Sequence, residues 1–154
     1  MVFVRHGEST YNLLNRFTGW QDVPLTEDGV KQARKAGSIL REHGYEFNLA
    51  YTSMLKRALW TYHTIADELD IHWIEHRKDW RLNEKHYGLL QGLQKDVEHN
   101  KHLNEKKLKE WRETFQGAGP GLRETDFRHP IHDRKYYGIV HPDALPEVES
   151  MKDC

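Results

Sequence analysis

The first residues able to do chemistry are Arg5, His6, Gly7 and Glu8, which directly follow an apolar run at residues 2–4. A neutral histidine can accept a phosphoryl group, because one ring nitrogen attacks while a hydrogen bond fixes the other. Arginine adds a planar, permanently charged group for phosphate oxygens. Taken alone the motif is a modest signal, since a lone histidine is more often a structural or surface residue.

A second arginine strengthens the phosphate hypothesis. Arg57 lies about one turn into an expected helix, just after a strand that ends in Thr52 and Ser53. A helix N-terminus favours anions, because its backbone N–H groups have no partners within the helix. The alternative is an ordinary solvated helix start with Lys56 and Arg57 at the surface.

A third polar stretch covers residues 81–88 and 91–95. It places Glu84 among basic and aromatic side chains. Such a carboxylate can act as a general acid and base. Moving a phosphoryl group between hydroxyls needs this proton transfer together with neutralisation of charge by Arg or Lys. A plain charged loop is the alternative for a stretch of this composition.

The elements that must position these residues alternate in the first half of the chain. Residues 2–4 predict a buried strand, residues 49–52 a second, and residues 73–75 a weaker third. Thr26 caps a predicted helix that Gly44 stops, and Ser53 caps another that runs to about residue 69. This β-α-β-α-β order predicts an α/β fold with a parallel sheet and crossover helices.

The second half of the chain has a different pattern. One amphipathic helix is predicted at roughly residues 103–115, followed by loops rich in Gly and Pro. Ser150 looks like the cap of a further helix that is cut off after one turn. The hydrophobic fraction is 37% and the mean hydropathy is -0.89, so little apolar surface is available to offset chain entropy. We therefore expect residues 1–154 to form a single, incomplete domain whose C-terminal portion is missing.

Charge and cysteine content limit the partners. The net charge is -1 with 31% charged residues, so no strong field attracts nucleic acid or a membrane. Cys154 is the single cysteine, and no segment reads as a leader or a membrane span, which favours a cytoplasmic protein. The pairs His99/His102 and His129/His132 lack thiols or an ordered carboxylate cluster, so no metal is expected.

Four ordered motifs together resemble the cofactor-dependent phosphoglycerate mutases of the histidine phosphatase superfamily. They are the strings at residues 4–9 and 15–20, at 51–53 with 55–58, and at 82–88 with 91–93. The resemblance runs over essentially the whole chain and concerns the N-terminal part of family members. It implies a three-layer α/β/α phosphoglycerate mutase-like fold with a mostly parallel sheet.

The resemblance also implies roles for individual residues. His6 would be the nucleophile, primed by 2,3-bisphosphoglycerate, and Glu84 the proton donor and acceptor, with Arg5 and Arg57 beside them. The remaining implied contacts to substrate and phosphate are Gly7, Glu8, Ser9, Asn12, Thr18, Gly19, Lys85, His86, Tyr87, Lys95 and Arg112. The implied reaction interconverts 3-phosphoglycerate and 2-phosphoglycerate in glycolysis without a metal. Phosphoglycerates are then the expected small-molecule partners, and formation of a homo-oligomer stays open.

Three departures from the family pattern keep alternatives open. Glu113 follows Arg112 where family members carry a second arginine, and Gln94 replaces the usual asparagine. A His-Gly-Asn segment with the family's second active-site histidine has no counterpart. The alternatives are an inactive remnant that binds phosphorylated ligands, a bisphosphoglycerate synthase, or a phosphatase. Ser9 favours the mutases, since the synthases tend to have glycine there.

Overall fold

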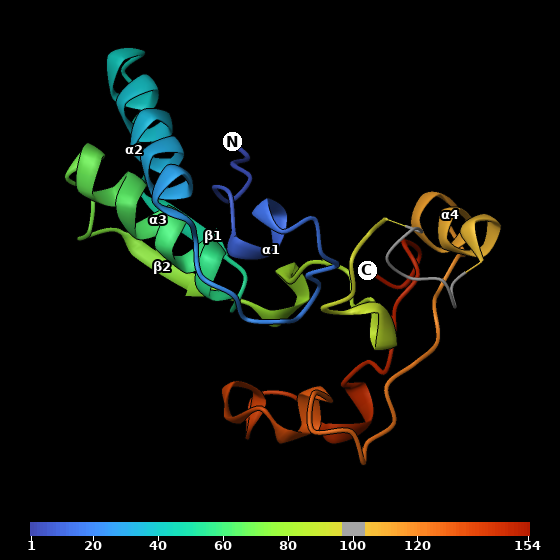
Figure 1. Ribbon diagram of the computed structural model, residues 1–154. Helices are drawn as coiled ribbons and strands as arrows, with labels where there is room; N and C mark the ends of the chain where they lie inside the picture. Colours follow the sequence, from blue (N-terminus) through green and yellow to red (C-terminus); the bar gives the residue numbers. More distant parts are fainter. Residues whose placement is uncertain (97–103) are drawn as a thin grey trace. The chain divides into compact units, whose positions relative to one another are not determined.

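The computed structural model describes residues 1–96 and 104–154, which form two compact units (Figure 1). The first unit consists of Met1–Leu13 and Asp22–Asn83, and the second of Leu14–Gln21 and Glu84–Cys154. The chain therefore crosses between the units three times.

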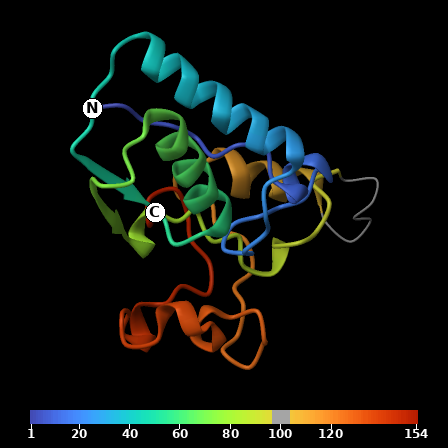
Figure 2. The same cartoon turned by 90° about the vertical axis from the view of Figure 1, so that its left-hand side faces the viewer.

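The first unit contains a pair of parallel strands and two packed helices. β1 (Leu49–Thr52) pairs with β2 (Glu75–Lys78) in parallel register, and α3 (Lys56–Leu69) connects them. α2 (Glu27–Glu42) lies along α3, as both views show (Figures 1 and 2). The predicted α/β class with a parallel sheet and a crossover helix is confirmed.

The ends of α2 follow the chemistry of its capping residues. The Thr26 hydroxyl accepts a hydrogen bond from the Gly29 N–H at 3.0 Å, which satisfies one of the free donors of the first turn. Glu27 and Asp28 place negative charge at the positive end of the helix dipole. Gly44 follows with φ of 69°, a left-handed conformation that favours glycine and ends the helix. The predicted cap and stop are both confirmed.

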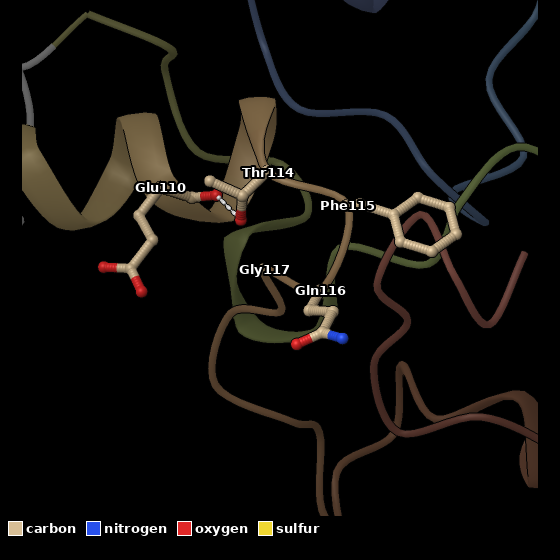
Figure 3. Close-up of a pocket in the computed structure, with 5 residues that line it drawn as sticks. All are labelled: Glu110, Thr114, Phe115, Gln116 and Gly117. Carbon is tan, nitrogen blue, oxygen red and sulfur yellow. Dashed lines mark hydrogen bonds between the residues drawn. The ribbon is translucent and has the colours of Figure 1, made fainter.

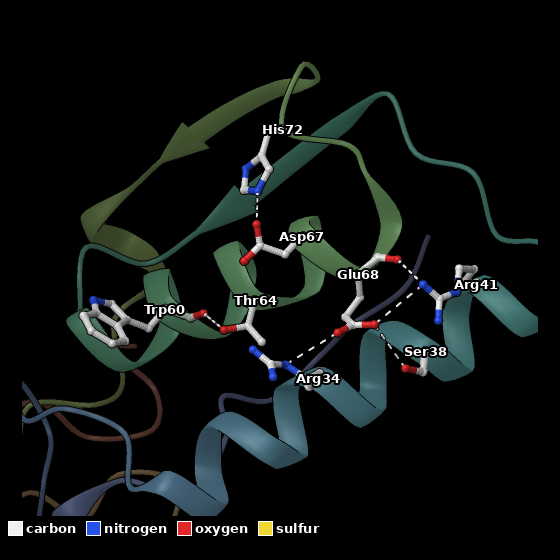
Figure 4. A network of polar contacts seen from close by, with 8 residues as sticks. All are labelled: Arg34, Ser38, Arg41, Trp60, Thr64, Asp67, Glu68 and His72. Atoms are coloured by element: carbon white, nitrogen blue, oxygen red, sulfur yellow. Dashed lines mark hydrogen bonds and ion pairs between the residues drawn. The ribbon is translucent and has the colours of Figure 1, made fainter.

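Contact between α2 and α3 combines close packing with a polar cluster (Figure 4). A side chain at Gly37 would lie 2.7 Å from Glu68 Cβ, so only glycine permits this approach. The Glu68 carboxylate receives a hydrogen bond from Ser38 and lies within 3.5–3.6 Å of guanidinium nitrogens of Arg34 and Arg41. These contacts fix how α3 lies on α2.

The prediction of a buried strand at residues 2–4 is wrong. Val2, Phe3 and Val4 are exposed and belong to no strand. An apolar run becomes a strand only where another strand offers backbone partners, and among the described residues β1 pairs only with β2. α1 (Thr10–Leu13) follows this segment.

Two predicted boundaries also shift. β2 begins at Glu75, two residues later than the predicted third strand, which included Trp73 and Ile74. The N-cap of α3 is Leu55 rather than Ser53, whose hydroxyl instead accepts the Leu55 N–H at 3.3 Å. The helix therefore starts two residues later than the sequence indicates.

The second unit is built mainly from loops around a small core. Buried Phe17, Leu90 and Leu108 form this core, and Tyr87 and Trp111 pack against it. Leu108 comes from α4 (Glu105–Glu113), which is capped by the Asn104 carboxamide. The predicted helix at 103–115 is thus confirmed over its central part, and its first residue lies outside the described residues. The described residues also form short 3-10 helices: η1 (Trp80–Leu82) in the first unit and, in the second, η2 (Gly88–Leu90), η4 (Pro130–His132), η5 (Arg134–Tyr136) and η6 (Pro142–Ala144).

Neither membrane spans nor metal centres stand out in the part of the chain that the structure describes. None of its helices has the length and apolar character needed to cross a bilayer. No three His, Cys, Asp or Glu side chains in residues 1–96 and 104–154 are grouped as metal ligands. His99 and His102 lie outside the described residues.

Candidate functional site

His6 is held in one tautomer by the Gly7 carbonyl and by Arg57. Its Nδ1 lies 2.7 Å from the carbonyl oxygen of Gly7, which can only accept, so Nδ1 carries the proton. Its Nε2 receives the Nε–H of Arg57 at 3.2 Å and therefore presents a lone pair. An Nε2 that carries no proton, on a ring fixed through Nδ1, is the form of histidine that attacks phosphorus.

The surroundings also favour the neutral form of His6. Burial lowers the pKa of the imidazole, and the charges of Arg57 and Arg5 lower it further, against the opposing effect of the bond to Gly7. The predicted grouping of Arg5, His6 and Arg57 is therefore present in the first unit. Arg57 is 1% exposed, so its charge acts on the ring through little solvent.

α3 supplies two residues of this site from successive turns. Arg57 and Thr61 lie four positions apart and so share one face of the helix. The Thr61 hydroxyl accepts the Gly7 N–H at 3.0 Å and donates to the Arg57 carbonyl at 2.8 Å. The sequence interpretation missed Thr61, although its spacing of four from Arg57 would have indicated a shared face.

Two glycines let the site loop cross α2 at close range. A Cβ on Gly7 would lie 2.2 Å from the Gly29 carbonyl oxygen, and a Cβ on Gly29 would lie 2.1 Å from the Glu8 carbonyl oxygen. The Thr26 N–H donates to the Glu8 carbonyl at 2.9 Å, and the Thr26 hydroxyl donates to the Glu8 carboxylate at 2.8 Å. The structure thus gives Glu8 a role in fastening the loop to the start of α2.

Ser9 and Asn12, both predicted ligand contacts, bind one another. The Ser9 N–H and hydroxyl donate to Asn12 Oδ1 at 3.0 and 2.9 Å, and the Asn12 N–H donates to Ser9 Oγ at 3.2 Å. This reciprocal arrangement closes the turn that begins α1. A direct contact from either residue to a ligand stays a prediction.

A second group of predicted residues gathers in the second unit. Tyr87 has a raised pKa because it is buried and because the charge of Glu84 and a hydrogen bond with that carboxylate oppose its ionisation. The Arg112 charge acts in the opposite direction on Tyr87, and its guanidinium lies 5.8 Å from the centre of the Phe17 ring. The carboxylate, phenol and guanidinium predicted to act on substrate are therefore neighbours.

Lys85 and His86 are buried in protein contacts. Lys85 Nζ donates to the carbonyls of Trp111 and Gly117 at 2.8 and 3.0 Å, and its side chain is 5% exposed. Burial lowers the pKa of the His86 ring to about 4, and His129 nearby has the same effect. Both residues support the loop that carries Glu84, and their predicted contact with substrate stays a prediction.

The remaining predicted residues also lie in the second unit. Gly19 has φ of 55°, and a Cβ there would come within 2.4 Å of Gln91 Oε1, so glycine is required. Thr18 is buried, and its carbonyl accepts the Gln21 N–H at 3.1 Å. The Lys95 N–H donates to the Asn15 carbonyl at 2.8 Å. These contacts shape the loops and leave the predicted ligand roles untested.

A shallow, polar pocket lies at the C-terminal end of α4 (Figure 3). It is lined by Glu110, Thr114, Phe115, Gln116 and Gly117, and the Thr114 hydroxyl donates to the Glu110 carbonyl at 2.7 Å. The C-terminal end of a helix carries partial negative charge, and Glu110 adds a full one. The pocket is therefore unsuited to a phosphate.

The parallel α/β arrangement and the neutral histidine bonded to a buried arginine define a phosphate-handling class of protein. Residues 1–129 match the family described as histidine phosphatase superfamily (branch 1), and the chain belongs to that superfamily.

Two curated relatives carry the name 2,3-bisphosphoglycerate-dependent phosphoglycerate mutase. The protein from Elusimicrobium minutum is 50% identical over 99% of this chain and 61% of its own length. The protein from Nitrosococcus oceani is 48% identical over 99% of this chain and 62% of its own length. The chain thus spans about three-fifths of the length of these relatives.

Solved structures share the fold. A phosphoglycerate mutase from Bacillus anthracis is 30% identical with a TM-score of 0.56, covering 58% of this chain and 39% of its own. A mycobacterial glucosyl-3-phosphoglycerate phosphatase is 32% identical with a TM-score of 0.62, covering 74% of this chain and 51% of its own. The expected phosphoglycerate mutase-like fold is confirmed by these similarities.

Proposed function

We propose that this chain carries the phosphohistidine chemistry of a 2,3-bisphosphoglycerate-dependent phosphoglycerate mutase, which interconverts 3-phosphoglycerate and 2-phosphoglycerate. One observation carries the proposal: His6 presents Nε2 to the buried Arg57 while Nδ1 is fixed on the Gly7 carbonyl. The names of the curated relatives support the same reaction class. A cytoplasmic location, phosphoglycerates as the partners and a role in glycolysis belong to this proposal.

The residues present fit a phosphorylated primer. A neutral imidazole, a buried guanidinium and the additional charge of Arg5 suit a group with several anionic oxygens. When bound, 2,3-bisphosphoglycerate supplies the phosphoryl group that primes His6. The three side chains just named would hold it.

Each residue then has a defined task. His6 Nε2 forms a bond to phosphorus as the phosphorus–oxygen bond of the donor breaks, and the proton stays on Nδ1, where it remains hydrogen-bonded to the Gly7 carbonyl. The Nε–H of Arg57 leaves Nε2 and donates to a phosphate oxygen. In the proposal, Glu84 gives a proton to the departing oxygen and takes one from the acceptor hydroxyl in the second transfer.

The first experiment measures the phosphoenzyme. The chain is incubated with 2,3-bisphosphoglycerate, and mass spectrometry locates acid-labile phosphate, with circular dichroism to verify the fold. We expect label on His6, none in a His6→Asn variant, and turnover of 3-phosphoglycerate that falls roughly 10²- to 10⁴-fold in Glu84→Gln. A folded chain without label would overturn the proposal and favour a remnant that only binds phosphorylated ligands.

A phosphatase activity is the second candidate. It is favoured by the similarity to the mycobacterial phosphatase, which has the higher TM-score of the two structures above. The two activities differ in the acceptor, which is a sugar-acid hydroxyl in one and water in the other. Release of inorganic phosphate in step with loss of 2,3-bisphosphoglycerate, without conversion of added 3-phosphoglycerate into 2-phosphoglycerate, identifies the phosphatase.

A further inference from the structure

Glu149 and His86 bind each other through both backbone and side chain in the second unit. The His86 N–H donates to Glu149 Oε2 at 2.7 Å, and the Glu149 N–H donates to the His86 carbonyl at 2.9 Å. Both backbone groups of His86 are therefore used by one residue that lies 63 positions away in the sequence. Such a pair fixes the orientation of the peptide planes on either side of His86.

Neighbouring contacts show that this link belongs to a larger arrangement. The Leu122 N–H donates to the Glu147 carbonyl at 3.0 Å, and the Leu89 N–H donates to the Pro120 carbonyl at 2.9 Å. A Cβ on Gly88 would lie 2.2 Å from the Pro120 carbonyl oxygen. The segment that begins at Glu84 is therefore packed between residues 117–122 and 147–150.

The segment itself has little regular structure to hold it. Residues 84–87 belong to no helix or strand, so their conformation depends on contacts from elsewhere in the chain. His86 stands directly before Tyr87 and two residues after Glu84, whose carboxylate and phenol interact. Fixing the His86 backbone therefore orients the side chains on both sides of it.

We infer that Glu149 is a positioning residue for the Glu84–Tyr87 pair: its carboxylate holds the His86 amide and thereby sets where the proposed proton donor points. This inference rests on the proposed function for the role of Glu84 and extends it to a residue that does not touch substrate. Half-burial raises the pKa of the Glu149 carboxyl, while the bond from the His86 N–H favours its ionised form.

The test measures the pKa of Tyr87, which depends on its contact with Glu84, by NMR titration of a ¹³C label on the phenol. Glu84→Gln is expected to lower the Tyr87 pKa in the wild-type background, because the carboxylate charge is removed. In a Glu149→Ala background the Tyr87 pKa is expected to lie already nearer its ordinary value and to respond little to Glu84→Gln. This double-mutant cycle isolates the coupling that the Glu149 contact maintains.

Matched variants separate positioning from charge and from folding. Glu149→Gln keeps an oxygen acceptor for the His86 N–H and is expected to preserve the wild-type titration. Glu147→Ala removes an acid from the same segment, but the contacts of Glu147 with Leu122 and with the His86 ring are made by its backbone, which alanine keeps, so no change is expected. If Glu149→Ala does not fold, Glu149→Asp shortens the same carboxylate by one methylene and is expected to shift Tyr87 in the same direction.

Turnover gives the second readout. For an active wild-type chain, Glu149→Ala is expected to lower kcat roughly 10- to 100-fold with KM nearly unchanged, and Glu149→Gln to restore most of it. An unchanged Glu84–Tyr87 coupling in Glu149→Ala would overturn the inference. A wild-type chain that never turns over while the coupling is lost as expected would overturn the proposed function and support the positioning role.

Discussion

The hydrogen bond from Arg57 Nε to His6 Nε2, 3.2 Å long, occupies the lone pair that would attack phosphorus in the proposed reaction. The same N–H is a strong donor to an anionic oxygen, and a charged acceptor is preferred over a neutral ring nitrogen. Arrival of a phosphate would therefore draw the donor away from the ring and expose the nucleophile at the same moment. In the proposed reaction, Arg57 would therefore cover Nε2 until a phosphate is present.

We expect Arg57→Gln to raise the pKa of His6, because a positive charge that disfavours the imidazolium is lost. Burial, the largest cause of the lowered pKa, remains, so the value should stay below 6.5. Phosphorylation of His6 should slow roughly 10²- to 10³-fold, as for the loss of one charged donor. Titration of the histidine C2–H resonance by NMR checks the first effect. Lys56→Gln makes the same charge change at the neighbouring exposed position and should leave the His6 titration unaltered.

The lowered pKa of His86 leads us to expect that stability depends on pH. Its pKa is about 4 in the folded chain and about 6.5 when unfolded, so the unfolded state binds the proton first as pH falls. Stability should decrease between about pH 6.5 and pH 4, by on the order of 3 kcal/mol at the lower end. Urea unfolding at pH 7 and pH 4.5 measures this slope. In His86→Asn, whose amide oxygen can replace Nδ1 as acceptor of the Gly88 N–H, the slope should be smaller. An equal slope in both proteins would show that other groups cause the acid sensitivity.

Gly29→Ala should destabilise the first unit in spite of its helical position. Alanine is the better helix former by about 1 kcal/mol, but the new methyl group would meet the Glu8 carbonyl at 2.1 Å. We expect a net loss of about 2 kcal/mol or more, with slower phosphorylation of His6. The comparison is Gly44→Ala, which meets no atom within 4 Å and bears only the strain of φ at 69°. Thermal unfolding followed by circular dichroism measures both, and equal melting temperatures for wild type and Gly29→Ala would contradict the close contact.

Glu68→Gln should weaken the contact between α2 and α3 only slightly. Its partners Arg34 and Arg41 are largely exposed, so solvent screens the ion pairs and each is worth about 0.2–1 kcal/mol. The stability difference from wild type should shrink further in about 1 M salt. Urea titrations at low and high salt test this. A large, salt-independent loss would contradict screened ion pairs, and it could not come from packing against Gly37, because glutamine keeps the Cβ and Cγ atoms that meet this glycine.

Local signals in the sequence were sufficient for the elements that depend on neighbouring residues. The cap at Thr26, the stop at Gly44 and the limits of β1 all follow from side chains within a few positions of the boundary. The strand expected at residues 2–4 failed, because strand formation needs a partner that no local pattern specifies. The same holds for the start of α3, where a hydroxyl at Ser53 suggests a cap that the backbone does not use.

Some residues of the candidate site were likewise predictable from the sequence, and others were not. His6, Arg5 and Arg57 were predicted together and are found together in the first unit. Arg5 and His6 are consecutive residues, and Arg57, in the first turn of α3, reaches them. Thr61 and Gly29 were missed because both contact backbone atoms of residues 7–8. A sequence shows which side chains are chemically active, but it does not show where two stretches of backbone come close together. The sequence assigned no role to Glu149, because its contact with His86 spans 63 positions.

The interleaving of the two units has a consequence for synthesis on the ribosome. All of the first unit has emerged once Asn83 has left the tunnel, whereas Phe17 needs Leu90 and Leu108 to be buried. Residues 14–21, which carry the apolar side chains of Leu14, Phe17 and Trp20, must therefore remain without their core partners while the parts of the chain before and after them fold. A chaperone that recognises short exposed hydrophobic segments has its opportunity in that interval, and the interval lasts until α4 is made.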